Sequence, residues 1–233
     1  MTRESTKRRV LVLPGTARPS DKRYQRVYET IENGATKCAC ECRTVSYPGQ
    51  EGPSSGLLTY LGAVGRAYEA GRVFEPHWVI GRSLGCVIAL AVAGMKEPWV
   101  ERIEGVVLWG PVLGSEMQRR WGSDEAQAEQ VRRYEEQRGT FLAADFYKQL
   151  PAIESVAATA SRNLRIARGS REEYNEDIDL KCLESIHRRL QPSYLREVRM
   201  VEGVKHEVVA EECSPEALSA YLSVLFDPIA GSR

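Results

Sequence analysis

The sequence predicts an α/β fold, with a mainly parallel six-stranded sheet flanked by helices. Short apolar segments alternate along the chain with longer segments in which apolar residues recur at helical spacing. Residues 10–13 form an unbroken apolar run, which is typical of a strand covered on both faces. The expected strands are residues 8–13, 37–47, 77–80, 103–109, 163–168 and 195–202.

The segments between these strands predict helices in right-handed crossovers. Gly34 and Gly71 follow the first two helical segments, and we expect them to end those helices. Residues 112–162 are long for a single crossover and their polar, Arg- and Glu-rich pattern carries no strand signal, so we expect a small helical insertion there. The other expected helices are residues 21–33, 57–70, 86–94, 179–190 and 215–226.

The composition indicates a single globular domain over residues 1–233. Acidic and basic residues balance at 32 each, so no global field would attract nucleic acid or an anionic membrane. The apolar run at residues 10–13 is too short for the core of a signal peptide, and no segment is long enough to span a bilayer. We therefore expect a cytoplasmic protein with neither nucleic-acid nor membrane partners.

Three of the six cysteines, Cys38, Cys40 and Cys42, alternate along the expected second strand. Alternation would place their sulfur atoms on one face, which invites a metal-binding interpretation. A tetrahedral zinc site usually brackets a turn with a Cys-x-x-Cys pair, and the sequence has no such pair. We expect reduced thiols in a partly buried strand, and no metal.

The segment that carries chemistry is Gly81-Arg82-Ser83-Leu84-Gly85. A buried strand leads into it and a run of small apolar residues follows, so the five residues form a strand–turn–helix junction. Such a sharp turn strains its central residue and needs residues without bulk two places before and after it. Ser83 would then be lifted clear of the sheet, at the start of the following helix.

This junction resembles the nucleophile elbow of the α/β-hydrolase family. The resemblance implies that Ser83 attacks a carbonyl carbon and that the backbone N–H of Leu84 binds the resulting oxyanion. A second donor would be the N–H of Thr16, because Gly15 matches the family's glycine after the first strand, and Pro14 stands where the family usually has histidine. The family also implies that residues 112–162 form a helical cap, and that two N-terminal strands are reduced here.

The resemblance requires a histidine as base, and the sequence has three. His77 begins the strand that leads into the elbow, so it lies at the wrong end of the sheet. His187 falls in a charged helical segment and is expected to be solvated. His206 follows the last strand, at the carboxyl edge where open α/β sheets place their sites, and it matches the family's base.

The acid of the triad would follow the strand before the last one, giving the chain order serine, acid, histidine. Glu172 comes three residues after Gly169 at the expected strand end, which is the family's usual spacing. The family more often has aspartate there, so Glu173 and Asp177 stay open as alternatives.

Together these residues predict a carboxylesterase or thioesterase that acts on a small, partly apolar molecule through an acyl-enzyme on Ser83, with no cofactor. Arg82 stands where related thioesterases often have histidine. Its side chain would face either an anionic group of the substrate or solvent, and we expect solvent. The alternatives are a non-hydrolytic use of the triad, in acyl transfer, cyclisation or elimination, or a ligand receptor on the same fold.

Overall fold

The computed structural model describes residues 7–111, 122–151, 163–170 and 196–204, together with Ser223 and Phe226. The helix expected at residues 179–190 lies outside the described residues. So does the helix expected at 215–226, except that Ser223 and Phe226 are helical.

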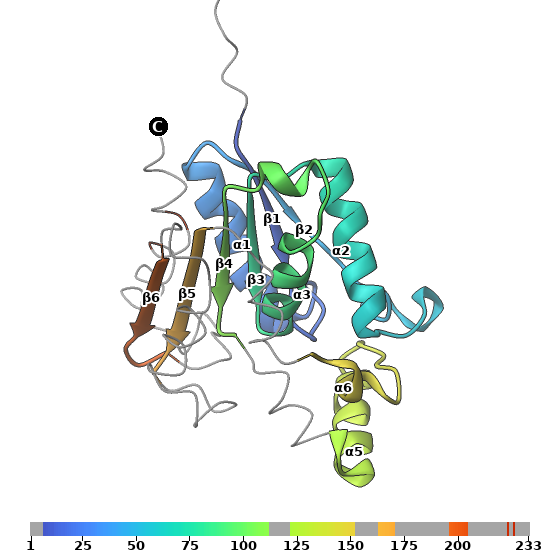
Figure 1. The fold of residues 1–233 in the computed structure, drawn as a ribbon. Helices are drawn as coiled ribbons and strands as arrows, with labels where there is room; N and C mark the ends of the chain where they lie inside the picture. The colour runs from blue at the N-terminus through green and yellow to red at the C-terminus, as the bar shows by residue number, and fades with distance from the viewer. Residues whose placement is uncertain are drawn as a thin grey trace, which may run out of the picture.

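In these described residues, six strands form one sheet in the order β2-β1-β3-β4-β5-β6. Each neighbouring pair is parallel, which confirms the predicted sheet. The arrows in Figure 1 point the same way, so the carboxyl ends of the strands share one edge. The strands are β1 (Arg9–Leu13), β2 (Glu41–Thr44), β3 (Trp78–Arg82), β4 (Gly105–Trp109), β5 (Asn163–Gly169) and β6 (Arg196–Val201).

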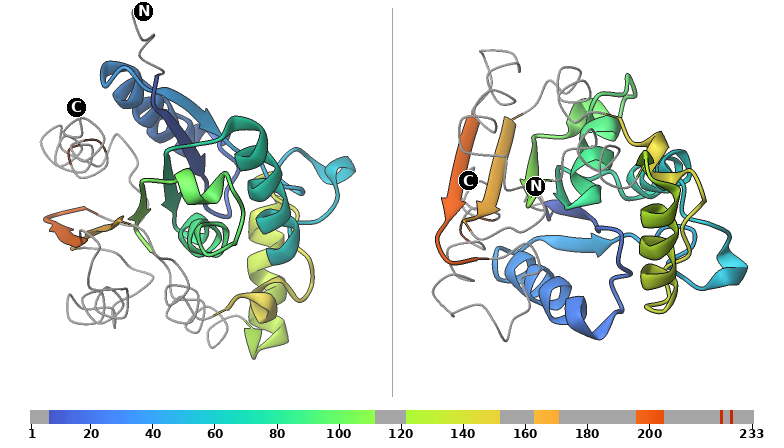
Figure 2. Two further views of the ribbon diagram at one scale, coloured as in Figure 1. Left: turned by 45° about the horizontal axis from the view of Figure 1, so that its top comes forward. Right: turned by 90° about the horizontal axis from the view of Figure 1, so that it is seen from below.

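Helices cover both faces of the sheet, as the unbroken apolar strands require. Figure 2 shows α1 (Lys22–Lys37) on one face, with α2 (Tyr60–Phe74) and α3 (Leu84–Ala93) on the other. Two short 3₁₀ turns, Pro53–Ser55 and Val100–Arg102, join the larger elements.

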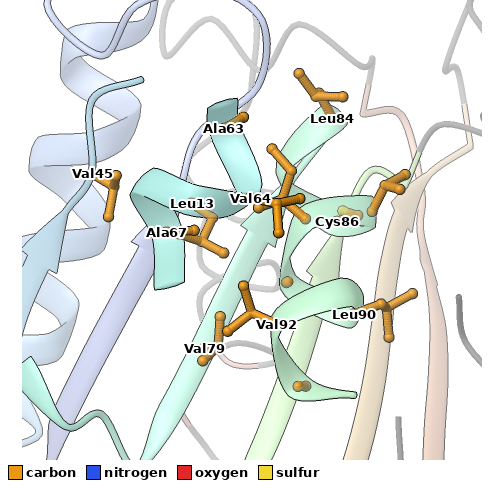
Figure 3. Packing of buried hydrophobic residues seen from close by; sticks show 14 of the residues in the cluster. Leu13, Val45, Ala63, Val64, Ala67, Val79, Leu84, Cys86, Leu90 and Val92 are labelled. Atoms are coloured by element: carbon orange, nitrogen blue, oxygen red, sulfur yellow. The ribbon is translucent and has the colours of Figure 1, made fainter. Parts of the chain in front are cut away.

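Alternation along each strand divides the core into two layers. Leu11, Leu13 and Val79 belong to the apolar cluster that lies under α2 and α3. Their chain neighbours Val10 and Ile80 belong to a second cluster under α1. Figure 3 shows side chains of α2 and α3 gathered over Leu13 and Val79. Successive residues along a strand therefore face alternate helix layers, first α1 and then α2 and α3.

Gly34 and Gly71 do not end helices, and that prediction is wrong. Gly34 lies inside α1 and Gly71 lies inside α2, and α2 continues to a left-handed cap at Glu75. A Cβ on Gly34 would come within 2.6 Å of the Phe226 ring, and one on Gly71 within 2.4 Å of the Trp99 ring. Each glycine lets an aromatic ring lie against the helix backbone, a tertiary reason that sequence periodicity does not contain.

The second strand is shorter than predicted, because α1 extends to Lys37 and Ala39 adopts a left-handed turn with φ 58°. Cys38 lies in that turn, Cys40 is buried just after it and only Cys42 lies on β2. The expectation that the three sulfurs share one strand face is therefore wrong. Burial raises the pKa of the Cys42 thiol to about 12, so this thiol stays protonated.

The described part of the insertion, residues 122–151, contains α5 (Glu125–Glu136) and α6 (Phe146–Gln149). In Figure 1 they lie beside the N-terminal end of α2. Backbone bonds fasten the segment to the loop after β2: Phe141 N–H donates to Gly49 (2.9 Å), and Leu58 N–H donates to Phe141 (2.7 Å). The insertion is thus anchored at the carboxyl side of the sheet, and its role as a cap over the site stays a prediction.

None of the helices in the part of the chain that the structure describes combines the length and the apolar character needed to cross a membrane.

Candidate active site

Ser83 occupies a strained turn between β3 and α3. Its backbone has φ 53° and ψ −120°, a conformation that L-residues rarely adopt. Holding a residue there costs about 1–3 kcal/mol, which the surrounding structure must supply. The residue is 8% exposed, at the carboxyl edge of the sheet. The elbow that the sequence predicts is therefore present as a backbone conformation.

Two glycines make this turn sterically possible. A Cβ on Gly81 would lie 2.4 Å from the Gly85 carbonyl oxygen. A Cβ on Gly85 would lie 2.0 Å from the carbonyl oxygen of Leu13, at the end of β1. Neither position has room for a side chain, so the Gly-x-Ser-x-Gly spacing follows from close packing of the turn, α3 and β1.

The loop after β1 lies close to Ser83. A Cβ on Gly15 would lie 3.1 Å from the Cβ of Ser83. Leu84 is the first residue of α3, and the first N–H groups of an α-helix have no partner within the helix. These N–H groups carry the positive end of the helix dipole. The expected donors, the N–H groups of Leu84 and Thr16, thus belong to the two segments that meet at Ser83.

Two side chains, those of Tyr28 and Gln50, hydrogen-bond to the backbone of the loop after β1. The Gly15 N–H donates to the Tyr28 hydroxyl on α1 (3.3 Å). The Gln50 side chain, in the loop after β2, donates to the carbonyls of Gly15 (2.9 Å) and Thr16 (2.9 Å). Sequence reasoning missed both Tyr28 and Gln50, because contacts 13 to 35 residues apart leave no signal in local pattern.

Arg82 does not face solvent, and the expectation that it would is wrong. It is 4% exposed, and its guanidinium lies over the Tyr24 ring (4.7 Å to the centroid) and the Trp109 ring (5.8 Å). The cause is strand alternation, because residue 82 shares its face of β3 with Trp78 and Ile80, under α1. Burial raises the pKa of the Tyr28 phenol, and Arg82 opposes that rise by charge and hydrogen bonding.

His77 lies at the opposite end of β3 from Ser83, as the sequence indicates. Its Nδ1 accepts a hydrogen bond from the Arg9 N–H (3.1 Å). Burial lowers the pKa of His77 below its usual value, which favours the neutral ring that this bond requires. His77 therefore has a structural role at the amino edge of the sheet.

The other expected triad residues, His206 and Glu172, lie outside the described residues, as do the alternatives Glu173 and Asp177 and the third histidine, His187. The structure does describe where their loops begin. β5 and β6 end side by side at Gly169 and Val201. The Gly203 N–H donates to the Ser170 hydroxyl (2.9 Å), so the two loops start in contact at the edge where Ser83 lies.

The described residues hold no cluster of three or more His, Cys, Asp or Glu side chains that could bind a metal ion. The chemistry available from the described part of the site is that of a serine hydroxyl and backbone N–H groups.

Solved structures similar to this chain share the α/β-hydrolase fold. The esterase domain of a Rhodothermus marinus protein has a TM-score of 0.66 and 14% identity, covering 98% of this chain and 89% of that one. Est1E from Butyrivibrio proteoclasticus, solved with ferulic acid bound, has a TM-score of 0.68 and 10% identity, covering 96% and 88%. The monoacylglycerol lipase of Paleococcus ferrophilus has a TM-score of 0.66 and 14% identity, covering 96% and 94%.

No protein-family model matches the sequence, and no curated protein matches it. The structural similarity therefore establishes that this chain has the α/β-hydrolase fold, and function has to be argued from the site.

Proposed function

We propose that the protein is a serine hydrolase that cleaves an ester or thioester of a small, partly apolar molecule. The observation that supports this most is the strained backbone of Ser83 at the β3–α3 junction, with φ 53° and ψ −120°. Backbone strain of this size is concentrated at functional sites, and here it presents a hydroxyl at the carboxyl edge of the sheet.

In the proposed reaction, Ser83 attacks the carbonyl carbon while His206 takes the hydroxyl proton. The N–H groups of Leu84 and Thr16 stabilise the oxyanion that forms. When the intermediate collapses, the leaving alcohol or thiol receives the proton from His206, and the acyl group stays on Ser83. Water activated by His206 then releases the acid, and no cofactor or metal takes part.

Glu172 is the proposed acid, which would fix the tautomer of His206 and stabilise its protonated form. The test is a set of amide variants, Glu172→Gln, Glu173→Gln and Asp177→Asn. The variant that removes the true acid should lose about 10⁴-fold in kcat. Replacing the aspartate of a serine-protease triad by its amide has an effect of this size. The other two variants should keep their activity, since charged loop residues without a partner in the site contribute little.

The proposed substrates are small acyl esters or thioesters. A panel of p-nitrophenyl esters of increasing chain length, with acyl-thioesters of matched length, would identify the class. We expect turnover by the native chain and by Ser54→Ala, which removes an exposed hydroxyl in the loop after β2. Ser83→Ala should remove turnover while its circular dichroism spectrum and melting temperature stay close to those of the native chain.

The same panel separates the alternatives. Turnover that requires an added alcohol or thiol as acyl acceptor would point to acyl transfer. No turnover of any ester or thioester, in a folded protein, would contradict the hydrolase and favour a receptor.

A further inference from the structure

The Gln50 side chain makes an unusual set of contacts in the loop after β2. Its Nε2 lies within hydrogen-bond distance of three consecutive carbonyl oxygens, those of Gly15 (2.9 Å), Thr16 (2.9 Å) and Ala17 (3.3 Å). Gln50 is 3% exposed, so a buried side chain links two loops that lie 33 to 35 residues apart. A buried amide that contacts successive peptide groups fixes the path of that loop.

The orientation of the amide follows from its surroundings. Its Oε1 accepts a hydrogen bond from the Tyr47 N–H (3.0 Å), which requires oxygen at that position. Its nitrogen faces only carbonyl oxygens among these partners, which requires a donor. The Gln50 N–H in turn donates to the Tyr47 carbonyl (3.0 Å). The turn from Tyr47 to Gln50 therefore fixes the position of the Gln50 side chain, which then contacts the loop after β1.

The direction of the carbonyls determines the direction of the N–H groups. In a planar trans peptide, the C=O and the N–H of the next residue point to opposite sides. Since the Gly15 carbonyl points at Gln50, the Thr16 N–H points away from Gln50. Pro14 has no N–H, and the Gly15 N–H is engaged by Tyr28 (3.3 Å). Thr16 therefore offers the first N–H of this loop that Tyr28 does not engage and that points away from Gln50.

We infer that Gln50 is a positioning residue that holds the Thr16 N–H in place to stabilise the oxyanion formed on Ser83. This rests on the proposed function, because it needs an oxyanion at Ser83. Gln50 touches no reacting atom and acts through the backbone of the loop. Catalysis by such donors depends on their being held in place before the charge forms, and a displacement of about 1 Å can cost about 10²-fold in rate.

The test compares Gln50→Met, which keeps the length of the side chain but has no donor, with Gln50→Asn, which keeps the amide but is one methylene shorter. Gln25→Met is the matched control, because it removes the same amide from an exposed position on α1. The Gln25 Nε2 donates to the Glu29 Oε1 (2.8 Å) and contacts neither loop of the site. The measurements are kcat, KM and the inhibition constant of an acyl trifluoromethyl ketone.

The inhibitor reports directly on the oxyanion. The Ser83 oxygen bonds to the ketone carbon, the carbonyl electron pair moves to the ketone oxygen, and the hydroxyl proton passes to the base. Both Gln50 variants should lose about 10²-fold in kcat with KM nearly unchanged. Their inhibition constants should rise by the same factor as kcat/KM falls, and the loss should be equal for short and long acyl chains. Gln25→Met should change none of these ratios.

The outcomes separate the two claims. Absence of turnover in the native chain would contradict the proposed function itself. An active native chain whose folded Gln50 variants keep kcat, or lose activity through KM or for one chain length only, would overturn the role of Gln50. Loss of folding in both Gln50 variants would also overturn it, because Gln50 would then support the fold as a whole.

Discussion

Replacing Gly85 by alanine should damage both stability and the site. The new Cβ would lie 2.0 Å from the Leu13 carbonyl oxygen and 2.6 Å from that of Pro14, whereas real Cβ contacts stay above 3.0 Å. The helix α3 and the end of β1 must therefore separate by about 1 Å. Both close contacts are with backbone atoms, so the overpacking cost falls in the upper half of its usual range, about 2–3 kcal/mol, and the better helix propensity of alanine returns about 1 kcal/mol. We expect a net loss of about 1–2 kcal/mol.

For a domain of this size, that loss lowers the melting temperature by about 2–8 °C. The displaced segment leads directly into residues 14–16, so kcat for an ester should fall by about 10²-fold. Thermal unfolding followed by circular dichroism, with kcat on one p-nitrophenyl ester, measures both effects.

Gly65→Ala is the matched control. It is the same substitution inside a helix, and a Cβ at Gly65 meets nothing within 4 Å. It should raise the free energy of unfolding by about 0.4–1 kcal/mol and leave kcat unchanged. If Gly85→Ala matched Gly65→Ala in both measurements, the close packing of the elbow against β1 would be refuted as the reason for the glycine.

Three further predictions concern the elbow and the sheet. Ser83→Gly should raise the free energy of unfolding by about 1 kcal/mol in urea titrations, because glycine relieves the strain at φ 53°. Turnover should be lost. A variant less stable than the native chain would contradict the strain. Arg82→Lys should lower the free energy of unfolding by about 1–2 kcal/mol, because lysine cannot stack on Tyr24 and Trp109; a change within about 0.5 kcal/mol would mean that the side chain is solvated. Burial lowers the pKa of His77 below 6.5, so the unfolded chain binds more protons near and below pH 6.5, and stability falls as the pH drops through that value. His77→Asn should show a shallower fall than the native chain between about pH 7 and pH 5 in urea titrations, and an equal slope would show that His77 does not contribute.

The sequence predicted the sheet well, because its signals are local. The strands β1, β3 and β4 are mainly apolar runs, and the alternation of strands with helical segments predicts parallel pairing. The Gly-x-Ser-x-Gly spacing also predicted the strained turn, since close approach of backbones permits only glycine at positions 81 and 85.

The wrong predictions concern positions whose structure depends on a residue far away in the sequence. Gly34 and Gly71 were expected to end helices, yet they make room for Phe226 and Trp99. Gln50 contacts residues 33 to 35 positions away, so no local pattern identifies it. Arg82 is different, because its burial follows from alternation with Trp78 and Ile80 and was available from the sequence.

The most direct test of the account is covalent labelling with an alkyl fluorophosphonate, followed by peptide mass spectrometry. The proposal predicts a phosphonate adduct on Ser83, formed at a rate that falls sharply in His206→Ala and vanishes in Ser83→Ala. A folded native chain that stays unlabelled at Ser83, or is labelled there equally fast without the imidazole, would contradict the claim that this hydroxyl is an activated nucleophile.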